Sequence, residues 1–311
     1  MTAAPPNPLD SVDGGTIPGG GDAPAFVVRA DPASPIPVLI AVPHAGRIYT
    51  PALVAAMRDP ARAALRLEDR LADSLGEAVA AATGAALIVA RAPRAMLDLN
   101  RAADDIDWEM VEGGGPAIGG LPGRRARSGL GVIPRRLPGL GEIWRRRLVP
   151  SELDARIAGI HAPYHARIDQ ELARLRARWG AALLLDLHSM PPLGKGAGAA
   201  PDFVIGDRFG ATCEGGLVGA AFAYFAEAGR RAAHNRPYAG GYALERHAAM
   251  RRGVHALQLE VDRACYLDAD LRERGAGFER CVSLLAGLVR RLAAEVAMLG
   301  SGAASWPVAA E

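Results

Sequence analysis

The chain lacks the features that mark several classes of protein. It has only three cysteines, which are far apart and form no C-x-x-C pair, so neither a disulfide framework nor a thiolate zinc site is indicated. No apolar run approaches the roughly 20 residues that a membrane-spanning helix needs. The N-terminus also lacks the basic and apolar regions of a signal peptide. We therefore expect a protein of the reducing cytoplasm that has no membrane partner.

An excess of charge of either sign is also missing. The 36 basic and 34 acidic side chains leave a formal net charge of +2, and Lys195 is the only lysine. Binding to a nucleic acid depends on a strongly positive surface, so we expect no nucleic-acid partner. Hydrophobic residues make up 50% of the 311 residues, which is enough for a large core and excludes disorder of the whole chain.

The composition changes along the chain and suggests where the folded domain lies. Residues 1–34 are rich in Pro, Gly, Ala and Asp without an apolar period, which predicts a flexible leader. We expect a single α/β domain over residues 35–300 and a short C-terminal tail over 301–311. Within the domain, residues 112–141 are rich in Gly and Arg and too long for a plain connection, so they are predicted to form a loop or lid.

Apolar runs and helical patterns alternate through the domain. The runs that predict strands are 37–42, 85–90, 96–99, 182–187, 202–205 and 255–261. The patterns that predict helices cover 61–82, 151–179, 214–228 and 270–298. This alternation is typical of a three-layer α/β/α domain around a largely parallel or mixed sheet.

Polar side chains stand at the ends of these predicted strands, where ligands gather in α/β sheets. His44 and His188 each follow a buried strand, Asn100 and Arg101 follow another, and Glu260 lies near the end of a fourth. Two histidines and a carboxylate leave one position on a zinc ion for water, and a further glutamate can act as a base. The pattern therefore indicates a metal-dependent hydrolase.

Six short blocks carry a more specific signal. They are Val42-Pro43-His44-Ala45-Gly46, Asp69-x-x-x-Asp73, Asp98-Leu99-Asn100-Arg101, Asp186-Leu187-His188-Ser189, Asn235-Arg236-Pro237-Tyr238-x-Gly240-Gly241-Tyr242 and Gln258-Leu259-Glu260-Val261-Asp262-Arg263. In these blocks and in their order, the sequence resembles the N-formylglutamate amidohydrolase (deformylase) family. The resemblance extends from about residue 38 to residue 268, which is most of the chain.

The resemblance implies a fold, an activity and a cofactor. The fold would be the zinc-carboxypeptidase-like (phosphorylase/hydrolase-like) one that is shared with aspartoacylases. The domain would be catalytic and would hydrolyse the linear amide of N-formyl-L-glutamate, or of a close N-acyl amino acid, to formate and L-glutamate. The enzyme would use Zn²⁺ as its cofactor and would take part in histidine degradation.

The resemblance also implies three zinc ligands, His44, His188 and an acidic residue. Carboxypeptidases place the acid three residues after the first histidine, but that position is Arg47, which cannot bind a cation. The nearby acids are Glu68, Asp69 and Asp73, and we prefer Asp69 because it matches the family's aspartate. Each ligand has an alternative role. The histidines could be buried and bonded to the backbone, and Asp69 could be a helix N-cap.

The remaining site residues are expected to carry the chemistry and to bind the substrate. Glu260 is expected to be the base, although it could instead pair with Arg263, and Arg94 is expected to hold the oxyanion. The candidates for substrate binding are Asn100, Arg101, Asn235, Arg236, Tyr238 and Tyr242. An arginine offers a carboxylate a planar fork of donors that lysine lacks.

Other histidines and other functions stay open at this point. His161 and His165 are four residues apart, a spacing that a metal tolerates, but we expect them to be surface or packing residues. His247 is a less favoured candidate for the pocket. The rival functions are a zinc hydrolase of another N-acyl amino acid or small peptide, and a non-catalytic carboxylate-binding homologue. The sequence does not determine the oligomeric state.

Overall fold

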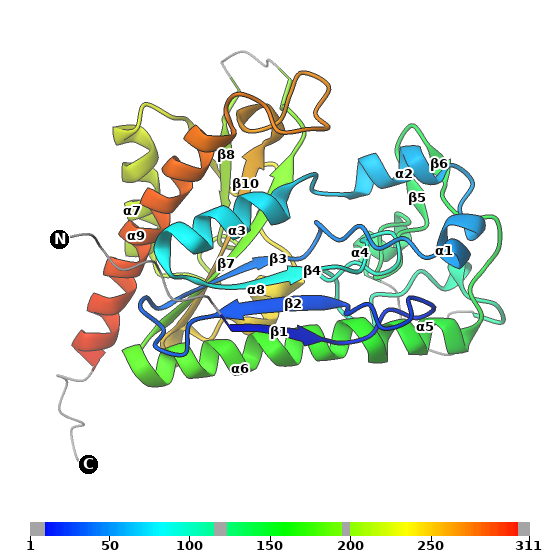
Figure 1. Cartoon of the computed structure of the whole chain (residues 1–311), viewed down its shortest axis with the longest axis horizontal. Coiled ribbons are helices and arrows are strands. Elements are labelled where there is room, and N and C mark those ends of the chain that lie inside the picture. Colours follow the sequence, from blue (N-terminus) through cyan, green and yellow to red (C-terminus); the bar gives the residue numbers. More distant parts are fainter. Residues whose placement is uncertain (1–9, 115–122, 195–199, 304–311) are drawn as a thin grey trace.

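The computed structural model describes residues 10–114, 123–194 and 200–303, and their centre is a mixed sheet (Figure 1). Its eight strands lie in the order β1-β2-β4-β3-β7-β10-β8-β9. In chain order they are β1 Asp10–Gly14, β2 Phe26–Ala30, β3 Val38–Val42, β4 Ala86–Ala90, β7 Ala182–Met190, β8 Phe203–Gly206, β9 Ala232–His234 and β10 Val254–Asp262. A separate small pair consists of β5 Arg136–Leu137 and β6 Gly141–Glu142.

The four central strands, β4, β3, β7 and β10, run parallel to one another. The strands β2 and β8 flank this group and pair with it in the antiparallel direction. All five residues of β3 and of β4 are buried, as their continuous apolar runs require in a sheet that is covered on both faces.

Helices cover both faces of the sheet (Figure 1). One face carries α3 Ala72–Thr83, α7 Gly215–Glu227 and α9 Phe278–Ala303, and the other carries α6 Ala162–Trp179 and α8 Tyr242–His247. Alternate residues of β3 join different clusters, with Leu39 and Ala41 packed on the α6 side and Val38 and Ile40 on the α9 side. The expected three-layer α/β/α fold with a mixed sheet is therefore confirmed.

The smaller helices lie at the carboxyl end of the parallel strands. They are α1 Pro51–Ala56, α2 Pro60–Leu67, α4 Arg124–Arg127 and α5 Pro150–Arg156. A π-helical turn, Ile157–His161, joins α5 to α6. None of the helices in the described part of the chain combines the length and the apolarity that crossing a membrane would require.

The flexible leader expected over residues 1–34 is wrong from residue 10 onward. The strands β1 and β2 form one edge of the sheet, and β2 pairs with β4. Phe26 and Val28 are buried, and the Phe26 ring lies 5.5 Å from that of Tyr164 in an edge-on contact. The apolar run of β2 is short and is surrounded by prolines and glycines. The hydrophobic pattern of the sequence therefore did not predict this strand. Residues 1–9 lie outside the described residues.

Three predicted elements also need correction. The helix expected over 61–82 is divided into α2 and α3 by residues 68–71, where Leu71 has a positive φ of 55°. Residues 96–99 form turns rather than a strand, and α9 begins at Phe278 rather than near residue 270. A local apolar pattern does not encode the packing that decides where these elements begin and end.

The Gly- and Arg-rich segment 112–141 is partly built into the domain. Its residues 123–141 include α4 and β5, and Val132 and Ile133 are buried in the core on the α6 side. The backbone N–H of Asp98 donates to the Val132 carbonyl over 2.8 Å. Residues 115–122 lie outside the described residues, so the lid stays a prediction. In the predicted tail, α9 continues to Ala303, and residues 304–311 are not described.

Candidate metal centre

Two adjacent parallel strands and the break between α2 and α3 bring three side chains together. His44 follows the end of β3, and His188 lies near the carboxyl end of the neighbouring β7. Asp69 lies in the break, and its backbone N–H donates to the His44 carbonyl over 2.9 Å. All three side chains are buried, with exposed fractions of 2% to 4%.

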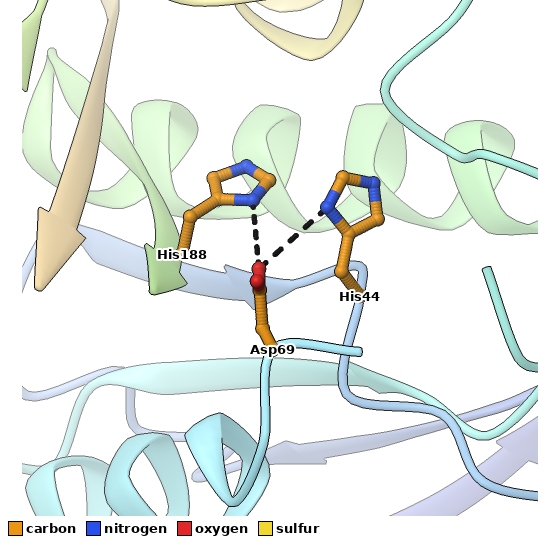
Figure 2. A group of neighbouring side chains, drawn as sticks. All are labelled: His44, Asp69 and His188. Atoms are coloured by element: carbon orange, nitrogen blue, oxygen red, sulfur yellow. Dashed lines mark hydrogen bonds and ion pairs between the residues drawn. The ribbon is translucent and has the colours of Figure 1, made fainter. Parts of the chain in front are cut away.

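The three side chains converge on one point (Figure 2). Asp69 Oδ2 lies 3.1 Å from His188 Nδ1 and 3.6 Å from His44 Nδ1. One donor atom from each residue lies within 4.8 Å of the other two. His44 Nδ1 is buried without a hydrogen-bond partner. Two imidazole nitrogens and a carboxylate oxygen in this arrangement fit a divalent cation such as Zn²⁺.

The second nitrogen of each ring is held by another carboxylate. His44 Nε2 lies 2.7 Å from Asp98 Oδ1, and His188 Nε2 lies 2.8 Å from Asp186 Oδ2. A carboxylate in this position keeps a proton on Nε2 and leaves the lone pair of Nδ1 for a metal. The sequence analysis assigned these two aspartates no role. Asp186 could have been found, because residues two apart on a strand share a face.

Of the three acids considered, Asp69 is the one beside both histidines. Asp73 Oδ1 instead accepts from Arg47 Nη1 over 3.2 Å, and Glu68 Oε2 lies 3.4 Å from Arg70 Nη1. Asp69 is also not the N-cap of α3, because that position is Leu71. The alternative in which the histidine rings bond to the backbone is likewise wrong, because their nitrogens face carboxylates.

The other oxygen of Asp69 is also fixed. Asp69 Oδ1 accepts from Ser189 Oγ and from Arg263 Nη2, each over 3.4 Å. Burial alone would raise the pKa of Asp69, but the hydrogen bond with His188 and the charges of His188 and His44 hold that pKa well below its ordinary value. Asp69 is therefore ionised, and Arg263 contacts Asp69 and Ser189 rather than forming the alternative pair with Glu260.

Glu260 lies beside the three residues but is not one of them. In the parallel pair of β10 and β7, Glu260 is in register with His188. Its Oε1 accepts from Gln258 Nε2 over 2.9 Å. Burial raises the pKa of Glu260 to about 7, although the charge of His188 opposes the shift. A carboxyl group with such a pKa can both accept and return a proton near neutral pH.

The segment 94–101 supplies the next group of residues. Arg94 Nε and Nη2 lie 3.0 and 2.9 Å from Asp98 Oδ2. The Asp98 carboxylate thus contacts both the Arg94 guanidinium and the His44 ring. Burial alone would lower the pKa of Arg94, but the charges of Asp98, Asp69 and Glu260 raise it. Arg94 therefore stays charged close to the base.

Asn100 and Arg101 differ in how far their side chains are already engaged. Asn100 Nδ2 lies 3.3 Å from His188 Nε2, and Asn100 Oδ1 accepts from the Ala243 N–H over 3.0 Å. The Asn100 amide thus contacts residues of the protein itself. Arg101 is partly exposed, and its Nη1 and Nε donate to the carbonyls of Asn100 and Leu130.

The block 235–242 contributes unevenly to the site. Asn235 has a positive φ of 58°, and its amide exchanges two hydrogen bonds with Asp207, which is a turn-forming role. Arg236 is exposed. Tyr238 is close enough to the centre that burial and the charges of Glu260 and Asp69 raise its pKa. The Tyr242 ring packs on His165, with centroids 5.1 Å apart.

Comparisons with known proteins identify relatives of this chain. The model of the N-formylglutamate amidohydrolase family matches residues 36–267. An N-formylglutamate deformylase from Pseudomonas aeruginosa is 32% identical over 243 residues, which are 75% of this chain and 83% of that protein. One from Pseudomonas putida is 29% identical over 256 residues, covering 75% of this chain and 82% of that protein.

A solved structure extends the similarity to three dimensions. The crystal structure of N-formylglutamate amidohydrolase from Ralstonia eutropha JMP134 is 32% identical and has a TM-score of 0.79. The match covers 88% of this chain and 98% of that one. Because the family model spans most of the chain and two of these relatives exceed 30% identity over three quarters of it or more, the chain belongs to the N-formylglutamate amidohydrolase family.

Proposed function

We propose that the protein is a zinc-dependent deformylase that hydrolyses N-formyl-L-glutamate to formate and L-glutamate. The observation that carries the proposal is the convergence of His44, Asp69 and His188 beside the buried Glu260. The names of the related proteins from Pseudomonas support the choice of a formylated glutamate as the substrate.

Glu260 would move the proton during the reaction. Zinc held by His44, Asp69 and His188 would polarise the formyl carbonyl and make a water molecule acidic. Glu260 accepts a proton from this water as the oxygen attacks the formyl carbon. It then returns the proton to the amine nitrogen as the C–N bond breaks, so that formate and glutamate leave.

Two arginines would contact different parts of the substrate. Arg94 is charged and interacts with Glu260, so it would stabilise the negative oxygen that forms on the formyl carbon. Arg101 would bind a carboxylate of the glutamate part through its planar fork of donors. Tyr238, which lies near Glu260, would add a hydroxyl on the same side.

The decisive experiment measures formate release and bound metal in the same preparation. We expect about one zinc per chain by elemental analysis, and formate release from N-formyl-L-glutamate that a chelator abolishes and added zinc restores. N-Acetyl-L-glutamate serves as the comparison substrate. Turnover of the acetyl but not the formyl compound would indicate a hydrolase of another N-acyl amino acid. Binding without any release of formate would indicate a non-catalytic homologue.

A further inference from the structure

A second group of buried histidines lies outside the metal centre. His161 ends the π-helical turn, His165 lies on α6, and His247 ends α8. Their exposed fractions are 4%, 1% and 5%. His161 and His165 were expected to be surface or packing residues; the surface position is wrong, and their burial and ring contacts agree with the packing role. His247 belongs to this group. The rings of His161 and Tyr242 pack against His165.

Three hydrogen bonds connect this group in one line. His247 Nδ1 lies 2.8 Å from Asp169 Oδ1, and His247 Nε2 lies 2.9 Å from His165 Nδ1. His165 Nε2 lies 3.0 Å from the carbonyl oxygen of Leu99. Each contact needs one proton, because Asp169 and the Leu99 carbonyl only accept. Two neutral imidazoles carry two protons in all, so three such bonds require one ring to be a cation.

The surroundings keep Asp169 ionised and His165 neutral. Burial, together with the charge interactions with His161, His247 and Arg246, lowers the pKa of His165 to about 2, so His165 is neutral. Burial alone would raise the pKa of Asp169, but His247 and Arg246 hold that pKa below its ordinary value. Arg246 Nη2 lies 3.0 Å from Asp169 Oδ2. Asp169 is therefore the acceptor at one end of the line, and the Leu99 carbonyl is the acceptor at the other.

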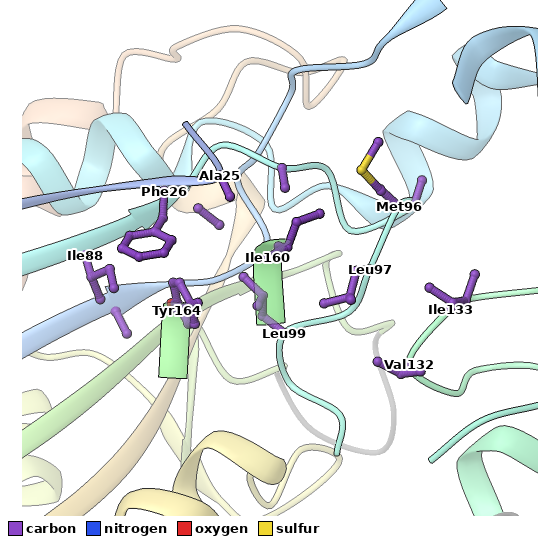
Figure 3. Packing of buried hydrophobic residues seen from close by; sticks show 14 of the residues in the cluster. Ala25, Phe26, Ile88, Met96, Leu97, Leu99, Val132, Ile133, Ile160 and Tyr164 are labelled. Carbon is purple, nitrogen blue, oxygen red and sulfur yellow. The ribbon is translucent and has the colours of Figure 1, made fainter. Parts of the chain in front are cut away.

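The line of hydrogen bonds ends on the segment that supports the metal centre. His165 donates to the carbonyl of Leu99, and His161 Nε2 donates to that of Arg101 over 2.8 Å. These two carbonyls flank Asn100. The apolar side of the same segment, Leu97 and Leu99, packs in the cluster that contains Ile160 (Figure 3). Residues 98–101 are thus held by both packing and hydrogen bonds.

We propose that Asp169, His247 and His165 form a hydrogen-bonded chain that, together with His161, positions residues 98–101 for catalysis. The chain acts through Asp98, which holds His44, through Asn100 beside His188, and through Arg101. Asp169, His247, His165 and His161 are positioning residues, since they act on the site through the backbone of residues 98–101. The part that concerns Arg101 rests on the proposed function.

Loss of the donor at position 165 has a definite consequence. Without an N–H at this position, the Leu99 carbonyl loses its hydrogen bond, and residues 98–101 lose one of their anchors. His165→Phe produces this state and keeps a ring in the cluster, whereas His165→Gln retains an amide that can donate to the same carbonyl.

The first test is nitrogen-15 NMR of the zinc-loaded protein at neutral pH, without substrate. We expect His165 to carry a proton on Nε2, which donates to the Leu99 carbonyl. In His165→Phe the backbone amide signals of residues 99–101 should shift, and in the matched control His165→Gln they should shift less. A His165 without a proton on Nε2 in the wild type, or equal shifts in the two variants, would overturn the proposal.

The second test is kinetic. His165→Phe should raise KM roughly five- to tenfold, with a smaller change in kcat and unchanged zinc content, because residues 98–101 lose an anchor and the hold of Arg101 on the substrate is loosened. His165→Gln retains an amide donor toward the Leu99 carbonyl and should retain more activity than His165→Phe. Equal losses in the two His165 variants would indicate packing alone and contradict the proposal. The NMR test uses no substrate, so it still decides the proposal if the protein does not cleave N-formyl-L-glutamate.

Discussion

In the metal centre, His44 and His188 each turn Nε2 toward a carboxylate and Nδ1 toward Asp69. In the cluster between α6 and α8, His165 instead faces a backbone carbonyl and the ring of His247. Both groups are buried on the same sheet. The comparison shows that a histidine's role depends on what its two nitrogens face. Converging lone pairs fit a cation, whereas a line of donors and acceptors fits a fixed proton arrangement.

The largest expected difference between the two groups is in bound zinc when one histidine is removed from each. His188→Ala should lose the bound zinc and nearly all deformylase activity, because two of three ligands cannot hold the metal in the same way. His247→Ala should keep its zinc, since that ring lies in the other cluster. Elemental analysis of both purified variants checks the expectation. Equal zinc in His188→Ala and wild type would remove His188 from the site.

The next largest effect concerns the base, which lies near the metal centre without being a ligand. Glu260→Gln keeps the shape of the side chain but cannot accept a proton. The rate should fall by about a hundredfold or more while zinc is retained, as is usual for the loss of a general base. Turnover close to that of the wild type, with metal bound, would exclude Glu260 as the base.

The pH dependence offers a related check on Glu260. Because burial raises its pKa to about 7, Glu260 is protonated and inactive as a base below that pH and becomes ionised above it. We therefore expect kcat/KM to rise with pH and to level off above about pH 7. The small residual activity of Glu260→Gln should not show this rise of kcat/KM with pH. If the rise persists unchanged in the variant, it must arise from the titration of another group.

Arg101 tests the segment that links the two histidine groups. Arg101→Lys keeps the charge but loses the fork, and Arg101→Ala loses both. Each variant should lower kcat/KM by a factor that corresponds to about 2–5 kcal/mol of lost transition-state binding, with the zinc content unchanged. The control substrate has a neutral amide in place of the matching carboxylate, and Arg101→Ala should barely distinguish it from the acid. If the variants keep the full wild-type preference for the acid, Arg236 is the next residue to test.

The smallest effect concerns the carboxylates behind the ligands. Asp186→Asn should keep a side chain of the same size at His188 Nε2 but leave the ring less firmly oriented and less basic. We expect zinc affinity to fall by about 10- to 100-fold, measured by competition with a chelator. Asp169→Asn is the matched change in the other cluster and should lower zinc affinity less, because that cluster reaches the histidine ligands only through residues 98–101. A similar loss in both variants would contradict the direct role of Asp186 in holding His188.

The predicted fold was right where the signal was local, and the structure brings the three predicted metal ligands together. The strands around β3, β4, β7 and β10 were predicted from continuous apolar runs, and the polar residues after two of them led to His44 and His188. Asp69 was chosen by family resemblance, and the break between α2 and α3 that places it was missed. Strands β1 and β2 were missed because their short runs gain stability only by pairing with the sheet.

The sequence by itself determined the α/β layering and which strand ends carry histidines, because apolar periodicity of two or 3.6 residues is a local property. The tertiary structure decided what each histidine nitrogen faces. His44 and Asp98 are 54 residues apart, and His165 and His247 are 82 apart. Only the folded sheet and the packing of α6 against α8 bring these groups within hydrogen-bond distance. The candidate metal centre and the hydrogen-bonded chain therefore arise from contacts that no short stretch of sequence contains.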